Sequence, residues 1–196
     1  MSDLVGVLRL ISTFPVKSVA GRCPQRAEVT RDGLRGDRSH VLAAADGTVL
    51  VAKHHPRLRE LRLDVTGDGV GDGVGTPVVR TPDGSTDLDA FLGVAGVHLR
   101  AADGGARQVA PVHVVTTAQR ADPAAGDSSR ANLLLELDGP EPDPGELVGA
   151  LLRCGPVELR LGERPRHCAG LFAAVAAGGQ LRVGDPVRLR LPARHR

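Results

Sequence analysis

Cys168 stands at a position where a reactive thiol can be displayed. Just before it, residues 157–161 alternate apolar and charged side chains, the period of a half-buried strand, so the cysteine follows a strand end. If the chain stays extended, Cys168 shares one face with Arg164 and Arg166, and the preceding histidine points the opposite way. Guanidinium groups nearby favour the thiolate, which attacks electrophiles and binds soft metals. The alternative is a small buried cysteine without chemistry.

A second group of polar side chains falls at the ends of expected strands and in tight loops. Lysine and arginine neutralise an anion, while hydroxyl and amide groups fix the positions of its oxygens. The members of this group are Lys17, Ser18, Arg38, Thr116, Thr117, Arg130 and Asn132. We expect an anion cradle if the fold brings these segments together.

Lysine is rare in this chain, because only Lys17 and Lys53 are lysines among 25 basic residues. An ammonium group is a compact charge with three donors, and a planar guanidinium does not replace it at every site. Lys17 is therefore a candidate for a chemical role, and an incidental surface lysine is the alternative.

The remaining pattern indicates short strands joined by turns. Expected strands include residues 5–11, 27–30, 40–44 and 61–65 in the first half and 112–117, 133–137 and 157–161 in the second. One helix is expected from Thr86 to Gly93. Residues 146–152 and 169–177 fit a helix or a strand equally well, and the GDGV repeat at 67–75 predicts a hairpin tip without chemistry. This spacing predicts a mainly β protein of barrel or meander type.

Composition excludes several classes of protein. The 25 basic and 23 acidic residues are evenly spread, so a nucleic-acid partner is not expected. No apolar run is long enough to span a membrane, and we expect a soluble cytoplasmic protein. The three cysteines lack the spacing of a zinc site or a disulfide framework. Without tryptophan or tyrosine and with three phenylalanines, the core must be aliphatic.

Two stretches of the sequence resemble MOSC domain proteins, a family named for the C-terminal domain of molybdenum cofactor sulfurases. Residues 14–21 (FPVKSVAG) and 33–38 (GLRGDR) resemble the β-barrel that precedes the MOSC domain. The approach to Cys168 and residues 179–187 (GQLRVGDPV) resemble the C-terminal part of the MOSC domain itself. The resemblance implies an N-terminal β-barrel, residues 1–85, packed on a MOSC β-barrel core, residues 86–196, with few short helices.

The resemblance also implies a site. In MOSC proteins similar to the mitochondrial amidoxime-reducing component, the matching residues hold a molybdenum cofactor (molybdopterin). By this resemblance Cys168 is the catalytic residue and metal ligand, and Lys17, Ser18, Arg38, Thr116, Thr117, Arg130 and Asn132 bind the cofactor. Two departures concern the substrate pocket: residues 128–132 read SSRAN instead of an Arg-x-Arg-Pro-Asn run, and residues 169–171 are not threonine-rich.

Three functions follow from these residues. The first is an oxidoreductase that reduces a small N-hydroxylated or otherwise oxidised substrate. Its electrons come from a partner protein, since the sequence has no flavin, haem or iron–sulfur motif. The second is a module that carries sulfur as a Cys168 persulfide or carries the cofactor to other enzymes. The third is a β-barrel interaction domain without chemistry.

Overall fold

A computed structural model describes residues 3–66, 75–102 and 109–192. These residues form fourteen strands and two short α-helices, which confirms the predicted mainly β class. The chain divides into two compact units, and each is described by itself. Unit 1 comprises Met1–Ser12, Cys23–Arg35 and Gln108–Arg196, and unit 2 comprises Thr13–Arg22 and Gly36–Arg107. Among the described residues, no helix is long and apolar enough to cross a membrane.

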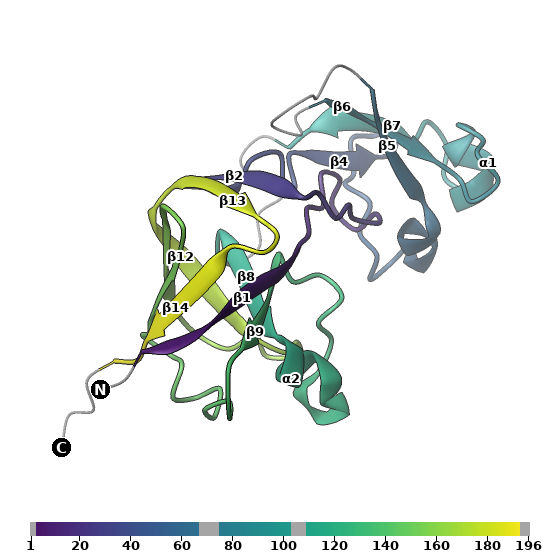
Figure 1. Ribbon diagram of the computed structural model, residues 1–196. Helices are drawn as coiled ribbons and strands as arrows, with labels where there is room; N and C mark the ends of the chain where they lie inside the picture. The colour runs from purple at the N-terminus through teal and green to yellow at the C-terminus, as the bar shows by residue number, and fades with distance from the viewer. Residues whose placement is uncertain (1–2, 67–74, 103–108, 193–196) are drawn as a thin grey trace. The chain divides into compact units, whose positions relative to one another are not determined.

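A closed barrel of seven strands forms most of unit 1 (Figure 1). In spatial order its strands are β1 (Leu4–Ile11), β14 (Pro186–Arg190), β10 (Leu151–Cys154), β11 (Val157–Leu161), β12 (Leu171–Ala177), β8 (Val112–Thr116) and β9 (Leu133–Leu137), which returns to β1. Neighbours are antiparallel except β8 and β9, which are parallel. The first strand of the chain therefore closes a barrel made mainly from its second half.

Alternation of side chains explains why these segments are strands. In β11, Val157, Leu159 and Leu161 are buried, and inward residues of β10 and of its other neighbour β14 continue the same aliphatic interior. Burying a leucine or valine side chain stabilises the fold by roughly 2 kcal/mol. The core is thus filled without large aromatic residues, as composition predicted.

A second sheet in unit 1 joins β13 (Gly179–Arg182), β2 (Arg26–Thr30) and β3 (Gly33–Leu34). The predicted turn at Gly33 is present, with φ of +111°. A Cβ atom on this residue would lie 2.3 Å from the carbonyl oxygen of Pro111, so glycine is required here.

Unit 2 contains two sheets of two strands each and an aliphatic cluster. β4 (His40–Ala43) pairs with β7 (His98–Ala101), and β5 (Arg62–Thr66) pairs with β6 (Thr76–Arg80). A 3-10 helix covers Pro56–Glu60. The predicted helix is α1 (Leu88–Leu92), and it ends at Gly93 as expected. Its cap is Asp87, whose side chain accepts a hydrogen bond from Ala90 N at 3.0 Å, instead of Thr86.

The structure resolves the two ambiguous segments. Residues 171–177 form β12, and residues 146–150 form turns before β10 begins at Leu151. The GDGV repeat lies almost entirely outside the described residues. The compact units differ from the predicted ranges 1–85 and 86–196, because β1 and β2 belong to the early chain but pair with strands of the late chain.

Candidate functional site

Cys168 lies in the connection between β11 and β12. The chain leaves the strand conformation at residue 162 and bends at residues 166–167. Cys168 then forms an isolated parallel bridge with Asp127, and Ala169 N donates a hydrogen bond to Asp127 O at 3.1 Å. The predicted alignment of Cys168 with Arg164 and Arg166 on one strand face is therefore wrong, since no strand reaches the cysteine.

The segment that meets Cys168 connects β8 to β9. It contains α2 (Thr117–Ala121) and a 3-10 turn (Pro123–Ala125), followed by Gly126 with φ of +99°. A Cβ atom on Gly126 would lie 3.0 Å from His167 O and 3.3 Å from Cys168 Cα. The predicted binding element at residues 128–132 thus directly follows the residues that contact the cysteine loop, the connection at residues 162–170.

The environment of Cys168 disfavours the thiolate form. Burial raises the pKa of the Cys168 thiol, and the negative charge of Asp127 raises this pKa further. Arg164 and Arg166 are exposed and do not offset these effects. The predicted stabilisation of the thiolate by these two arginines is therefore wrong, because their side chains lie in solvent.

His113 lies behind the cysteine loop. It is 3 % exposed, and its Nε2 donates a hydrogen bond to the Ala169 carbonyl at 2.7 Å, since a carbonyl can only accept. The imidazole also packs against the ring of Phe172 at 5.4 Å between centroids. The alternation of Val112, His113 and Val114 suggested a half-buried strand, but all five residues of β8 are buried. A near-continuous apolar run is the pattern of a strand buried on both faces.

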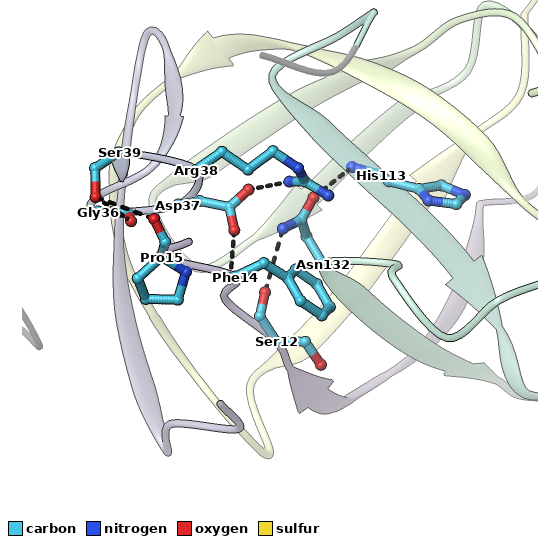
Figure 2. A network of polar contacts seen from close by, with 9 residues as sticks. All are labelled: Ser12, Phe14, Pro15, Gly36, Asp37, Arg38, Ser39, His113 and Asn132. Atoms are coloured by element: carbon cyan, nitrogen blue, oxygen red, sulfur yellow. Dashed lines mark hydrogen bonds and ion pairs between the residues drawn. The ribbon is translucent and has the colours of Figure 1, made fainter. Parts of the chain in front are cut away.

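Asn132 joins three segments of the barrel. It is fully buried, its Oδ1 accepts from His113 N at 3.0 Å, and its Nδ2 donates to Ser12 O at 3.2 Å (Figure 2). The side chain therefore connects the start of β9 to β8 and to the end of β1. Its contacts fix the backbone beside the cysteine loop.

Thr116 ends β8 and caps α2. Its Oγ1 accepts from Gln119 N at 3.2 Å and donates to Glu141 Oε2 at 2.6 Å. Gln119 Oε1 in turn accepts from Thr116 N, which completes a capping box. Because a hydroxyl has one proton, the Thr116 donor is committed to Glu141. Thr117 is half-buried at the start of α2, and Arg130 is half-buried in the turn before Asn132.

Three predicted residues lie on paired backbone segments of unit 2. Arg38 N donates to Phe14 O at 2.8 Å, His40 N donates to Pro15 O at 2.9 Å, and Lys17 N donates to His40 O at 3.0 Å. The fold therefore brings Lys17 and Ser18 into the neighbourhood of Arg38. Thr116, Thr117, Arg130, Asn132 and Cys168 belong to unit 1. That both sets form one cradle stays a prediction.

Ser18 and Arg38 share an unusual backbone conformation. Their φ angles are +68° and +51°, and among the described residues they are the non-glycine positions with positive φ. This left-handed conformation costs about 1–2 kcal/mol per residue and concentrates at functional sites. Both residues were predicted to bind the cofactor.

The Arg38 guanidinium is buried and only partly paired. Its Nη1 forms an ion pair with Asp37, whose other oxygen accepts from Phe14 N at 2.6 Å (Figure 2). The guanidinium carbon lies 5.3 Å from the centre of the Phe14 ring. Burial lowers the pKa of Arg38, and the charge of Asp37 opposes this shift. Arg38 Nη2 is buried and has no hydrogen-bond partner among the described residues.

These groups leave three donors for an anion. Besides Arg38 Nη2, the Lys17 ammonium makes no hydrogen bond or ion pair within the described chain. Ser18 Oγ accepts from Ala52 N at 3.1 Å, which leaves its hydroxyl proton to donate. The motif resemblance identified these residues, but it did not identify Asp37, which holds Arg38. Sequence patterns also did not identify Asp127 and His113, because each contacts residues beside Cys168 that lie far from it in the sequence.

Comparison with known proteins places the chain in a family. Residues 5–104, half of the 196-residue chain, match the MOSC N-terminal beta barrel domain, and the chain belongs to this family. The predicted resemblance is thereby confirmed. A crystal structure of the YuaD protein from Bacillus subtilis is similar with a TM-score of 0.52. The similarity covers 98 % of this chain and 99 % of that chain at 11 % identity, so it shows a shared fold. No curated protein matches the sequence.

Proposed function

We propose that this protein binds a molybdenum cofactor and reduces a small N-hydroxylated or otherwise oxidised substrate with electrons from a partner protein. Family membership supports the class of cofactor. The single observation that carries the proposal is Arg38, a buried guanidinium in a left-handed conformation with one donor unpaired. An unpaired buried donor costs roughly 1–3 kcal/mol, and an anionic ligand removes that cost.

The donor set fits a phosphate-bearing pterin. Lys17, Ser18 and Arg38 offer an ammonium, a hydroxyl and a guanidinium, the groups that bind phosphate oxygens. Within unit 1, Thr117 and Arg130 carry a hydroxyl and a cation. Thr116 and Asn132 support this set by fixing α2 and the start of β9, since their side chains already hydrogen bond within the protein.

Cys168 supplies the protein sulfur in this proposal. Its thiol must lose a proton on ligating a metal, and the adjoining contacts of Ala169 with Asp127 and His113 hold its backbone in place. When bound, the molybdenum cofactor supplies two-electron redox chemistry. The residues of the chain hold the cofactor and orient the cysteine.

The raised pKa of Cys168 disfavours the sulfur-carrier alternative. A persulfide-forming cysteine acts through its thiolate, and both burial and Asp127 oppose that form. A thiol that meets a metal is deprotonated by the metal itself.

Metal and pterin analysis tests the proposal in protein purified from a host that makes the cofactor. We expect stoichiometric molybdenum and pterin in the unaltered chain. Cys168→Ala loses the metal-dependent turnover but folds, and Arg38→Ala loses pterin. Cys23→Ala is the matched control, because Cys23 is exposed and should change neither content.

Two outcomes refute the proposal. Labile sulfur on Cys168 without molybdenum identifies a sulfur carrier. A chain that holds neither metal nor sulfur, from a host in which other molybdenum enzymes are loaded, identifies an interaction domain.

A further inference from the structure

The outer face of three neighbouring barrel strands carries a regular array of arginines. Strand register places two rows across β14, β10 and β11. The first row is Arg190, Leu151 and Arg160, and the second is Arg188, Arg153 and Glu158. The residues between them, such as Leu189, Leu152 and Leu159, point inward and are buried. We call these six outward positions the arginine face.

Within the part of the chain that the structure describes, positive charge exceeds negative charge on the arginine face. Arg153 pairs with Glu158 at 2.7 Å. Arg160, Arg188 and Arg190 are exposed and form no ion pair with any residue that the structure describes. Arg153 lies directly opposite Arg188, an arrangement of like charges that destabilises a sheet. Among the described residues, four arginines on this face thus stand beside two carboxylates, those of Glu158 and of nearby Asp3, and a partner can provide the missing negative charge.

A shallow hollow lies over the β10 and β14 side of this face. Its volume is about 80 Å³, and Asp3, Leu151, Arg153, Arg188 and Arg190 line it. Half-buried Leu151 gives it an apolar contact between cations. Arginine at such positions binds carboxylates through two parallel hydrogen bonds.

The barrel is closed, so β10, β11 and β14 have no free edge for an added strand. Recognition must use the outward side chains. Alternate residues on one strand lie about 6–7 Å apart, and facing residues on neighbouring strands about 5 Å apart. Carboxylates at similar distances from one another on a partner protein can pair with these arginines. No aromatic side chain is among the six residues of the face to stack on a nucleic-acid base.

We propose that the arginine face docks an acidic protein. Complementary charge steers such partners and accelerates their association.

The proposal is tested with a labelled oligoglutamate peptide, whose binding is followed by fluorescence anisotropy at low salt and at about 0.15 M salt. The test variant is Arg188→Glu/Arg190→Glu. The matched control is Arg120→Glu/Arg182→Glu, which changes net charge equally at exposed positions elsewhere in unit 1. We expect salt-sensitive binding, an affinity loss of at least ~10-fold in the test variant, and a change below ~2-fold in the control. Pterin content should stay unchanged in both.

Four outcomes overturn the proposal. They are no binding by the unaltered chain, equal losses in the two variants, tighter binding of pyrophosphate or duplex DNA through the same arginines, and loss of pterin in the test variant. Peptide binding needs no cofactor, so a chain without molybdenum refutes the proposed function independently. That result does not bear on the docking of an acidic protein by the arginine face.

Discussion

Arg38 combines three features that are each unfavourable in an apoprotein. Its guanidinium is buried, its backbone is left-handed, and one of its nitrogens is unpaired within the described chain. The surrounding contacts hold it there: Asp37 pairs with it and is itself fixed by Phe14 N. Such costs persist when a ligand offsets them, which is why the proposed function is argued from this residue.

Residue His113 allows a prediction about the cysteine loop. His113→Phe keeps a ring against Phe172 but removes the donor to the Ala169 carbonyl. We expect the free energy of unfolding to fall by roughly 1–3 kcal/mol, because a buried carbonyl loses its partner. We also expect Cys168 to react faster with iodoacetamide, because a loosened loop exposes the thiol. Urea unfolding and mass spectrometry of the labelled cysteines measure both effects.

Exposed Cys23 provides the internal reference for labelling, and His113→Gln is the matched variant that keeps an N–H donor. The glutamine variant should recover part of both effects. Labelling of Cys168 at the unaltered rate in the phenylalanine variant would show that His113 does not position this loop.

At the residue scale, the sequence identified the types of side chain better than their environments. Lys17, Ser18 and Arg38 were found from short motifs, and the structure places all three on paired segments. The thiolate argument failed because burial raises the pKa of Cys168, and the charge of Asp127, about forty positions earlier in the chain, raises it further. Residue spacing predicts which charges lie on the same segment. It does not predict which charges other segments bring close in the folded protein.

The connection between β8 and β9 is the element that meets the cysteine loop. β8 and β9 are parallel, so this segment must return along the barrel before β9 begins. On its way it places Gly126 and Asp127 against residues 167–169. The contact between these two loops, and not a strand face, sets the position of Cys168.

Gly126→Ala tests this contact. The substitution places a side chain at φ of +99° and a Cβ atom 3.0 Å from His167 O. Gly184→Ala is the control, because Gly184 has φ of +94° and its added Cβ would have no other atom within 4 Å. In both variants the free energy of unfolding should fall by about 1 kcal/mol, because the added side chain is held in a left-handed conformation. If the loop contact matters, the free energy of unfolding measured in urea should fall further in Gly126→Ala than in Gly184→Ala. Cys168 should also be labelled faster in Gly126→Ala. Equal effects in the two variants would contradict it.

Among the elements, regular segments were predicted well and connections poorly. Residues 133–137 form an apolar run and residues 157–161 alternate, and both are strands with those bounds. The path from residue 162 to Cys168 was not predicted, since a loop follows its tertiary contacts and not a period. The parallel pairing of β8 and β9 was also missed, because alternation does not encode strand direction.

In the whole molecule, the chain passes between the two units four times. β1 pairs with both β14 and β9, so the barrel cannot close without the first eleven residues. The family match at residues 5–104 therefore covers strands that belong to both units. A single cut in the sequence therefore does not separate the two compact units.

This topology predicts how fragments behave. Residues 86–196 expressed alone should not form a stable monomer, because β9 and β14 lose β1 and become free edges. Size-exclusion chromatography and thermal unfolding by circular dichroism measure the outcome. Co-expression with residues 1–85 should restore a cooperative transition. A monomeric 86–196 fragment that unfolds cooperatively would show that β1 is dispensable.

Sequence patterns could predict the class of fold but not this interleaving. Short alternating segments indicate strands, and an aliphatic composition indicates how the core is filled. Which strands pair depends on contacts between residues more than a hundred positions apart, such as Gly6 with Leu137. No local pattern carries that information.

A core built without tryptophan or tyrosine makes the protein nearly transparent in the near ultraviolet. Its three phenylalanines absorb weakly, so there is almost no intrinsic fluorescence to obscure other chromophores. A pterin held by the chain can thus be read directly from the absorption and emission spectra of the purified protein, without extraction.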